Sequence, residues 1–134
     1  YLHTLCNLTL FEHQDRNWAR TFADAFRGIF LAFRSEKCFT VHFIATLLVI
    51  ALSWWLEVTQ TEALLLTFCV LGVLGLELIN TAIERMADQV TDQVSPAIRD
   101  ALDISSGAVL LAALGAVGIG GSIFIPKILR LINL

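Results

Sequence analysis

The sequence predicts an all-α integral membrane protein, with three transmembrane helices and an N-terminal amphipathic helix on the membrane surface. Of the 134 residues, 57% are hydrophobic and only 16% are charged, whereas soluble domains average roughly 45–50% and 25%. Charged residues are also missing from three long windows and return between them, which is typical of successive bilayer crossings. These two observations argue against an ordinary soluble domain.

The first predicted helix is amphipathic and covers about residues 18–34. It follows residues 1–16, an N-terminal extension to which we assign no role. Large apolar side chains recur at spacings of three and four residues, which puts them on one helix face: Trp18, Phe22, Phe26, Ile29 and Phe33. Arg20 and Arg27 fall elsewhere on the helix. They either reach lipid phosphates, as in a surface anchor, or bind the phosphates of a nucleotide.

The transmembrane helices are expected at about residues 39–56, 63–87 and 104–126, within one membrane domain over 17–134. Each is long enough to cross, because about 20 apolar residues span a bilayer. The first and third are uncharged throughout. The third is rich in Ala and Gly, and Pro126 is expected to close it. The second carries acidic residues on its later turns.

The placement of charge predicts a cytoplasmic N-terminus. Basic residues precede the first span, whereas the Glu57–Glu62 connection holds two acids and no base, and cytoplasmic segments are usually the basic ones. The C-terminus, with Lys127 and Arg130, then lies outside, and the loop between the second and third spans is cytoplasmic. A net charge of −3 without a basic stripe argues against a nucleic-acid partner.

The later turns of the second span carry polar residues on one face. At about 100° per residue, positions i, i+3, i+7 and i+11 of a helix fall within about 80° of one another, and these positions hold Glu77, Asn80, Glu84 and Asp88. A carboxylate inside a membrane is costly and usually binds ions or takes part in catalysis. The other interpretation is that the span ends near Leu76 and that the acids lie in a solvated extension.

This polar row favours metal-dependent phosphoryl transfer. Because Mg²⁺ commonly binds through one or two carboxylates and phosphate oxygens, Glu84 and Glu36 are candidate metal ligands. Glu77 lies deepest, and a desolvated carboxylate suits the role of general base. The sequence holds no Gly-rich nucleotide loop and no protein-kinase motif. An ion or proton pathway is a further possibility, because membrane carboxylates also form relays.

Residues 77–84 read ELINTAIE, which resembles the signature E-x-x-N-[ST]-A-I-E of the prokaryotic diacylglycerol kinase and undecaprenol kinase family. Asp88 follows four residues later. Residues 25–29 and 33–39 resemble the family's surface helix and the acidic turn before its first span, and residues 103–109 resemble the start of its third span. The similarity covers about residues 17–126.

The resemblance implies an ATP- and Mg²⁺-dependent kinase of the inner membrane that phosphorylates the hydroxyl of a lipid, either diacylglycerol or undecaprenol. It also implies a homotrimer whose active sites lie between subunits. Glu77 would be the catalytic base, Glu36 and Glu84 the metal ligands, and Asn80 a supporting polar residue. The nucleotide would be bound by Arg20, Arg27, Glu36, Glu84, Asp88 and Asp103.

Two positions depart from the family pattern. The family usually has Lys just before the acid that Asp103 matches, where this chain has Leu102. Arg99, one turn before Asp103, is the candidate to replace the missing charge. The usual Tyr-His pair of this loop is Val94-Ser95 here. These departures leave open a non-catalytic member of the fold that acts as a membrane scaffold or nucleotide-binding regulator.

Overall fold

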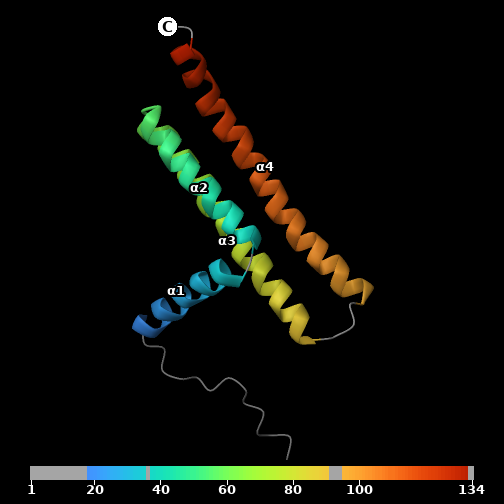
Figure 1. Cartoon of the computed structure of the whole chain (residues 1–134). Coiled ribbons are helices and arrows are strands. Elements are labelled where there is room, and N and C mark those ends of the chain that lie inside the picture. The colour runs from blue at the N-terminus through green and yellow to red at the C-terminus, as the bar shows by residue number, and fades with distance from the viewer. Residues whose placement is uncertain (1–17, 36, 91–94, 133–134) are drawn as a thin grey trace, which may run out of the picture. The chain divides into compact units, whose positions relative to one another are not determined.

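The computed structural model describes residues 18–35, 37–90 and 95–132, and this part of the chain forms four α-helices (Figure 1). They are α1 (Trp18–Ser35), α2 (Lys37–Trp55), α3 (Gln60–Val90) and α4 (Pro96–Ile132). The last three are long and apolar enough to cross a membrane. The structure therefore confirms the all-α membrane fold. The N-terminal extension, residues 1–16, lies outside the described residues.

The helix α1 is amphipathic, as its residue spacing predicts. The chain divides into two compact units, Tyr1–Leu31 and Ala32–Leu134, and most of α1 belongs to the first. Its large apolar side chains are exposed, among them Trp18, Phe22 and Phe26. A helix with one exposed apolar face and arginines elsewhere has the composition of a helix in the membrane interface.

The helices α3 and α4 both continue past residues at which the sequence suggested that a span could end. The helix α3 continues without a break past Leu76 to Val90, so the acids of the polar row belong to the same helix as the apolar part of the second span. The prediction that Pro126 closes the last helix is wrong, because α4 starts at Pro96 and passes through Pro126 to Ile132. A proline removes one backbone donor, and membrane helices tolerate this loss. Continuing the helix keeps Ile128 packed against the core.

A tight connection joins α2 to α3. Glu57 has a φ of 46°, and the Val58 amide donates to the Ser53 carbonyl oxygen at 3.2 Å, as in a Schellman helix end. Thr59 and Glu62 then form a capping box: the Thr59 amide donates to Glu62 Oε2 at 2.7 Å, and the Glu62 amide donates to Thr59 Oγ1 at 3.4 Å. These bonds satisfy backbone groups at both helix ends.

The same end of the bundle holds the hydrophobic core and an ion pair. The core cluster is formed by Leu56, Leu66, Ile123 and Phe124. Lys127 Nζ of α4 lies 3.1 Å from Glu62 Oε2 of α3. Because α3 packs against both α2 and α4, it is the central helix of this unit. No more than 22% of any span's most apolar window is buried within the chain, so the remaining apolar surface requires lipid or further subunits.

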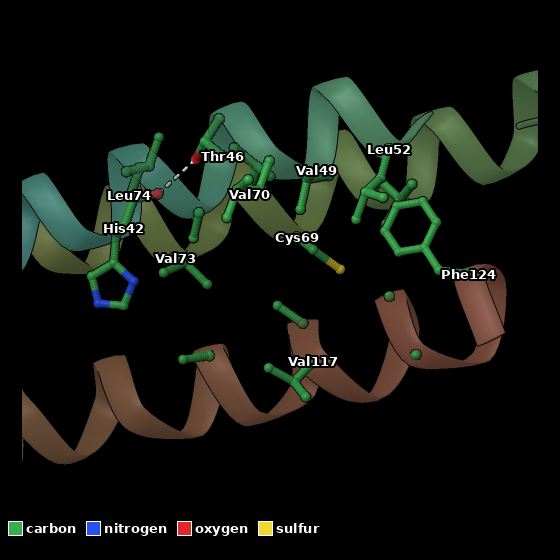
Figure 2. A pocket seen from close by; sticks show the side chains of 17 residues that line it. His42, Thr46, Val49, Leu52, Cys69, Val70, Val73, Leu74, Val117 and Phe124 are labelled. Atoms are coloured by element: carbon green, nitrogen blue, oxygen red, sulfur yellow. Dashed lines mark hydrogen bonds between the residues drawn. The ribbon is translucent and has the colours of Figure 1, made fainter. Parts of the chain in front are cut away.

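An apolar cavity of about 310 Å³ lies between α2, α3 and α4. Figure 2 shows His42 and Leu74 at one end of it and Leu52 and Phe124 at the other. The Thr46 hydroxyl on its wall donates to the His42 carbonyl oxygen at 2.9 Å. An ordered water needs two to four polar partners, so this wall suits hydrocarbon better than water.

Candidate functional site

The buried polar residues of the described chain gather on one turn of α3. Glu77, Asn80 and Thr81 are 2%, 7% and 4% exposed. Burying such groups is costly unless they are hydrogen-bonded or serve a function. This turn of α3 is therefore the candidate functional site of the described chain.

Burial decreases along the polar row toward the end of α3. Glu77 and Asn80 are buried, Glu84 is half-buried, and Asp88 is exposed. The row is thus one continuous path from an almost fully buried carboxylate to solvent. At 1.5 Å per residue, Glu77 and Glu84 are about 10 Å apart along the helix axis.

A hydrogen-bond network links this row to the start of α4. The Ser105 hydroxyl lies 2.6 Å from Asn80 Oδ1 and 2.9 Å from the Leu102 carbonyl oxygen. The Ser106 hydroxyl lies 3.5 Å from the same Asn80 oxygen. On its other side, Asn80 Nδ2 donates to Glu84 Oε1 at 2.8 Å. Asn80 therefore connects two serines of α4 to a carboxylate of α3.

The chemistry of the partners fixes the orientation of the Asn80 amide. A carboxylate accepts hydrogen bonds but does not donate them, so the amide NH₂ faces Glu84. A flipped amide would place two oxygens against each other at 2.8 Å. The Asn80 oxygen consequently faces α4, where the Ser105 hydroxyl is the closer donor. The network therefore holds one oxygen of the Glu84 carboxylate through Asn80.

Glu84 fits the role of a magnesium ligand. Its carboxylate is half-buried and fixed by Asn80, and one or two carboxylates suffice for Mg²⁺ when phosphate oxygens complete the shell. Within residues 18–35, 37–90 and 95–132, no three His, Cys, Asp or Glu side chains gather as a metal site. The other predicted ligand, Glu36, lies outside the described residues. Among the described residues, the Phe33 ring packs edge-on against those of Phe39 and Phe43, with centroids 6.3 and 5.0 Å away.

The predicted residues of α4 lie on its first turns. Asp103 and Arg99 are exposed, and Leu102 is half-buried. Ser95 caps the helix, because its hydroxyl oxygen accepts the Ile98 amide at 3.3 Å. Val94, the other departure in this loop, lies outside the described residues.

The predicted arginines Arg20 and Arg27 are both exposed on α1. They belong to the unit Tyr1–Leu31, whereas the polar row and the serines of α4 belong to the unit Ala32–Leu134. Their assignment to a nucleotide stays a prediction.

Sequence reasoning assigned no role to Ser105, Ser106 or Thr81. The pair Ser105-Ser106 follows Asp103 and opens the uncharged part of the last helix, which was the available signal. Small hydroxyl residues are common at helix contacts in membranes, so the pair does not by itself identify Asn80 as its partner.

Comparison with known proteins gives the family. The family model described as prokaryotic diacylglycerol kinase matches residues 23–124. The undecaprenol kinase of Bacillus subtilis is 35% identical over 109 residues, which cover 81% of this chain and 89% of that protein. The diacylglycerol kinase of Escherichia coli K12 is 31% identical over 93 residues, covering 69% of this chain and 76% of its own.

A third relative is longer than this chain. The diacylglycerol kinase of Synechocystis is 36% identical over 114 residues, which cover 83% of this chain but only 64% of that protein. The family match spans the polar row of α3, the serines of α4 and most of α1. The chain therefore belongs to the prokaryotic diacylglycerol kinase family, a family of membrane lipid kinases.

Proposed function

We propose that this protein transfers the γ-phosphoryl group of ATP to the hydroxyl of a membrane lipid, with Mg²⁺, at the cytoplasmic surface of the inner membrane. The observation that carries this proposal is Glu77, a carboxylate only 2% exposed within a membrane-spanning helix. Such a group is rare without a function. It lies on the same helix face as Glu84, the fixed and partly accessible carboxylate.

In the proposed reaction, Glu77 takes the proton of the lipid hydroxyl while the hydroxyl oxygen attacks the γ-phosphorus. A new O–P bond forms, the bond from phosphorus to the bridging oxygen breaks, and its electrons leave with ADP. Glu77 is suited to act as the base because it is buried in the span, where it is 2% exposed, and a positioned carboxylate there can accept the proton of a reacting hydroxyl. Bound Mg²⁺ would supply charge neutralisation for the phosphates, and Glu84 and Glu36 would hold it.

The remaining assignments concern the nucleotide. Asp88 and Asp103 are exposed near the accessible end of the row and contribute to its binding, and Arg20 and Arg27 contact its phosphates. Arg99 is the basic residue one turn before Asp103 and takes over part of the charge that a lysine at Leu102 would supply. A guanidinium one turn away does not reproduce a lysine ammonium, which makes this the weakest part of the phosphate site.

The apolar cavity supports a lipid substrate. It ends at Leu74, less than one turn before Glu77, so a hydrocarbon chain can lie beside the proposed base. The relatives include an undecaprenol kinase and diacylglycerol kinases, so both lipid alcohols are candidate substrates. Each is a long apolar lipid with one free hydroxyl.

The proposal includes a homotrimer with active sites between subunits and a cytoplasmic N-terminus. Support for further subunits comes from the large apolar area that the chain itself does not bury. Support for the orientation comes from Lys127, whose charge pairs with Glu62. The positive-inside tendency expects few basic residues on the outer side of the membrane, where the proposed orientation puts Lys127. The ion pair with Glu62 offsets the charge of Lys127 there.

A second candidate rests on Leu102. A family member without the lysine could keep the fold and the carboxylates and act as a membrane scaffold or nucleotide-binding regulator without turnover. Removal of one electrostatic donor typically costs 10²–10³ in rate. An ion or proton pathway has less support, since the polar row opens to solvent through Asp88 only at one end.

The test is a phosphorylation assay with purified protein in bicelles, Mg²⁺ and labelled ATP, with diacylglycerol and undecaprenol offered side by side. We expect product with the wild type and its loss in Glu77→Gln. The matched control is Glu57→Gln, which removes an exposed acid in the connection between α2 and α3, beyond the far end of α3 from the polar row, and should leave the rate unchanged. Turnover only after Leu102→Lys would favour the second candidate. Full turnover in Glu77→Gln would exclude Glu77 as the base.

A further inference from the structure

Thr81 carries a buried hydroxyl without a hydrogen-bond partner. Its residue is 4% exposed, and among the described residues its Oγ1 is the buried side-chain oxygen or nitrogen atom that lacks a partner. Buried polar groups in native proteins are almost always paired, and each exception calls for an explanation. Thr81 lies between Glu77 and Glu84 along α3, beside the polar row.

The missing bond is unusual because a helical threonine has a ready partner. Its hydroxyl can donate to the carbonyl oxygen four residues earlier. Other hydroxyls in these helices do so: Thr46 donates to His42 at 2.9 Å, Ser53 to Val49 at 2.7 Å, and Thr67 to Ala63 at 2.8 Å. Thr81 does not use this local solution, although the carbonyl of Glu77 stands in the same relation to it.

Thr81 lies at the level of α3 at which the phosphoryl group would be transferred. Along the helix axis it is about 6 Å from Glu77 and about 4.5 Å from Glu84, and around the axis it lies within about 60° of both. In the proposed reaction, Glu77 faces the lipid hydroxyl and Glu84 faces the metal-bound phosphates. The phosphoryl group passes between them, at the level of Thr81.

We propose that the Thr81 hydroxyl donates a hydrogen bond to a non-bridging oxygen of the phosphoryl group during its transfer from ATP to the lipid. This inference rests on the proposed function. The oxygen of ADP leaves with the electrons of the broken bond, the lipid oxygen forms the new bond, Glu77 holds the proton, and Thr81 is not consumed. A donor aimed at charge that develops in the transition state acts mainly on kcat.

The test compares Thr81→Val, which replaces the hydroxyl by a methyl of similar size, with Thr81→Ser, which keeps it. We expect Thr81→Val to lower kcat about 10- to 100-fold with little change in KM for ATP or lipid, and Thr81→Ser to stay within about threefold. The matched control is Thr67→Val on the same helix, whose hydroxyl is bonded to Ala63 on an exposed surface. It should keep the full rate.

A second readout separates this role from a structural one. ADP with aluminium fluoride imitates the phosphoryl group in flight, so Thr81→Val should weaken its inhibition by the same factor as kcat and leave inhibition by ADP alone unchanged. If the hydroxyl is only an unpaired buried group, Thr81→Val keeps kcat and resists unfolding by dodecyl sulfate better than the wild type. That outcome would overturn the inference while wild-type turnover upholds the proposed function. A wild type without turnover would overturn both.

Discussion

Replacing Ser105 by Ala tests whether the link between α4 and Glu84 matters. The Ser105 hydroxyl is 2.6 Å from Asn80 Oδ1, and Asn80 is 7% exposed. Leaving a buried acceptor unpaired costs about 1–3 kcal/mol. The Ser106 hydroxyl, at 3.5 Å from the same oxygen, can rotate to replace part of the bond. We therefore expect the lower end, about 1 kcal/mol, or roughly a fivefold change in an equilibrium constant.

This loss should appear in two measurements. The midpoint of unfolding in dodecyl sulfate should fall, because the contact joins two helices of one unit. The Mg²⁺ concentration for half-maximal lipid phosphorylation should rise severalfold, because Asn80 orients the Glu84 carboxylate through the 2.8 Å bond. A larger effect is expected for Asn80→Asp, which places a second negative charge against Glu84.

Ser106→Ala is the matched control for Ser105→Ala. It makes the same chemical change on the neighbouring residue of α4, with the same gain in helix propensity, but removes only the longer contact. Its effects on unfolding and on Mg²⁺ dependence should be clearly smaller. Equal effects of the two substitutions, or no effect of Ser105→Ala on either measurement, would refute the proposed role of this network.

Three further predictions follow from other parts of the structure. Glu62→Ala should lower the midpoint of unfolding in dodecyl sulfate, because it removes the capping box at the start of α3, and should leave the phosphorylation rate unchanged, since Glu62 is about 22 Å along α3 from Glu77. An unchanged unfolding midpoint would contradict the capping role. In single-cysteine variants, exposed Cys38 should react with a water-soluble maleimide at least about tenfold faster than Cys69, which lines the apolar cavity; equal rates would contradict that placement. Leu102→Lys should raise kcat about tenfold, whereas Leu102→Met should not, and equal rates for the two would show that this position does not contact phosphate.

Helical periodicity and composition predicted much of the architecture. The apolar spacing over residues 18–34 predicted α1 within one residue, and the uncharged windows predicted three long apolar helices. The row Glu77, Asn80, Glu84 and Asp88 was assigned to one helix face by angle alone, and α3 is a continuous helix through all four. The prediction that Pro126 ends the last helix was wrong because it used only the local preference of proline for helix ends. It did not take into account that residues before and after Pro126, such as Phe124 and Ile128, pack against the core.

The contacts between helices needed the tertiary structure. Sequence alone determined which residues share a helix and which face they occupy, because these relations depend only on a repeat of 3.6 residues. It did not determine that Asn80 meets Ser105, 25 residues away, or that Thr81 is buried without using its local partner. Which faces of α3 and α4 pack together is decided by the fit of whole helix surfaces. The uncharged, small-residue sequence of α4 marks none of its faces as the one that meets the polar row.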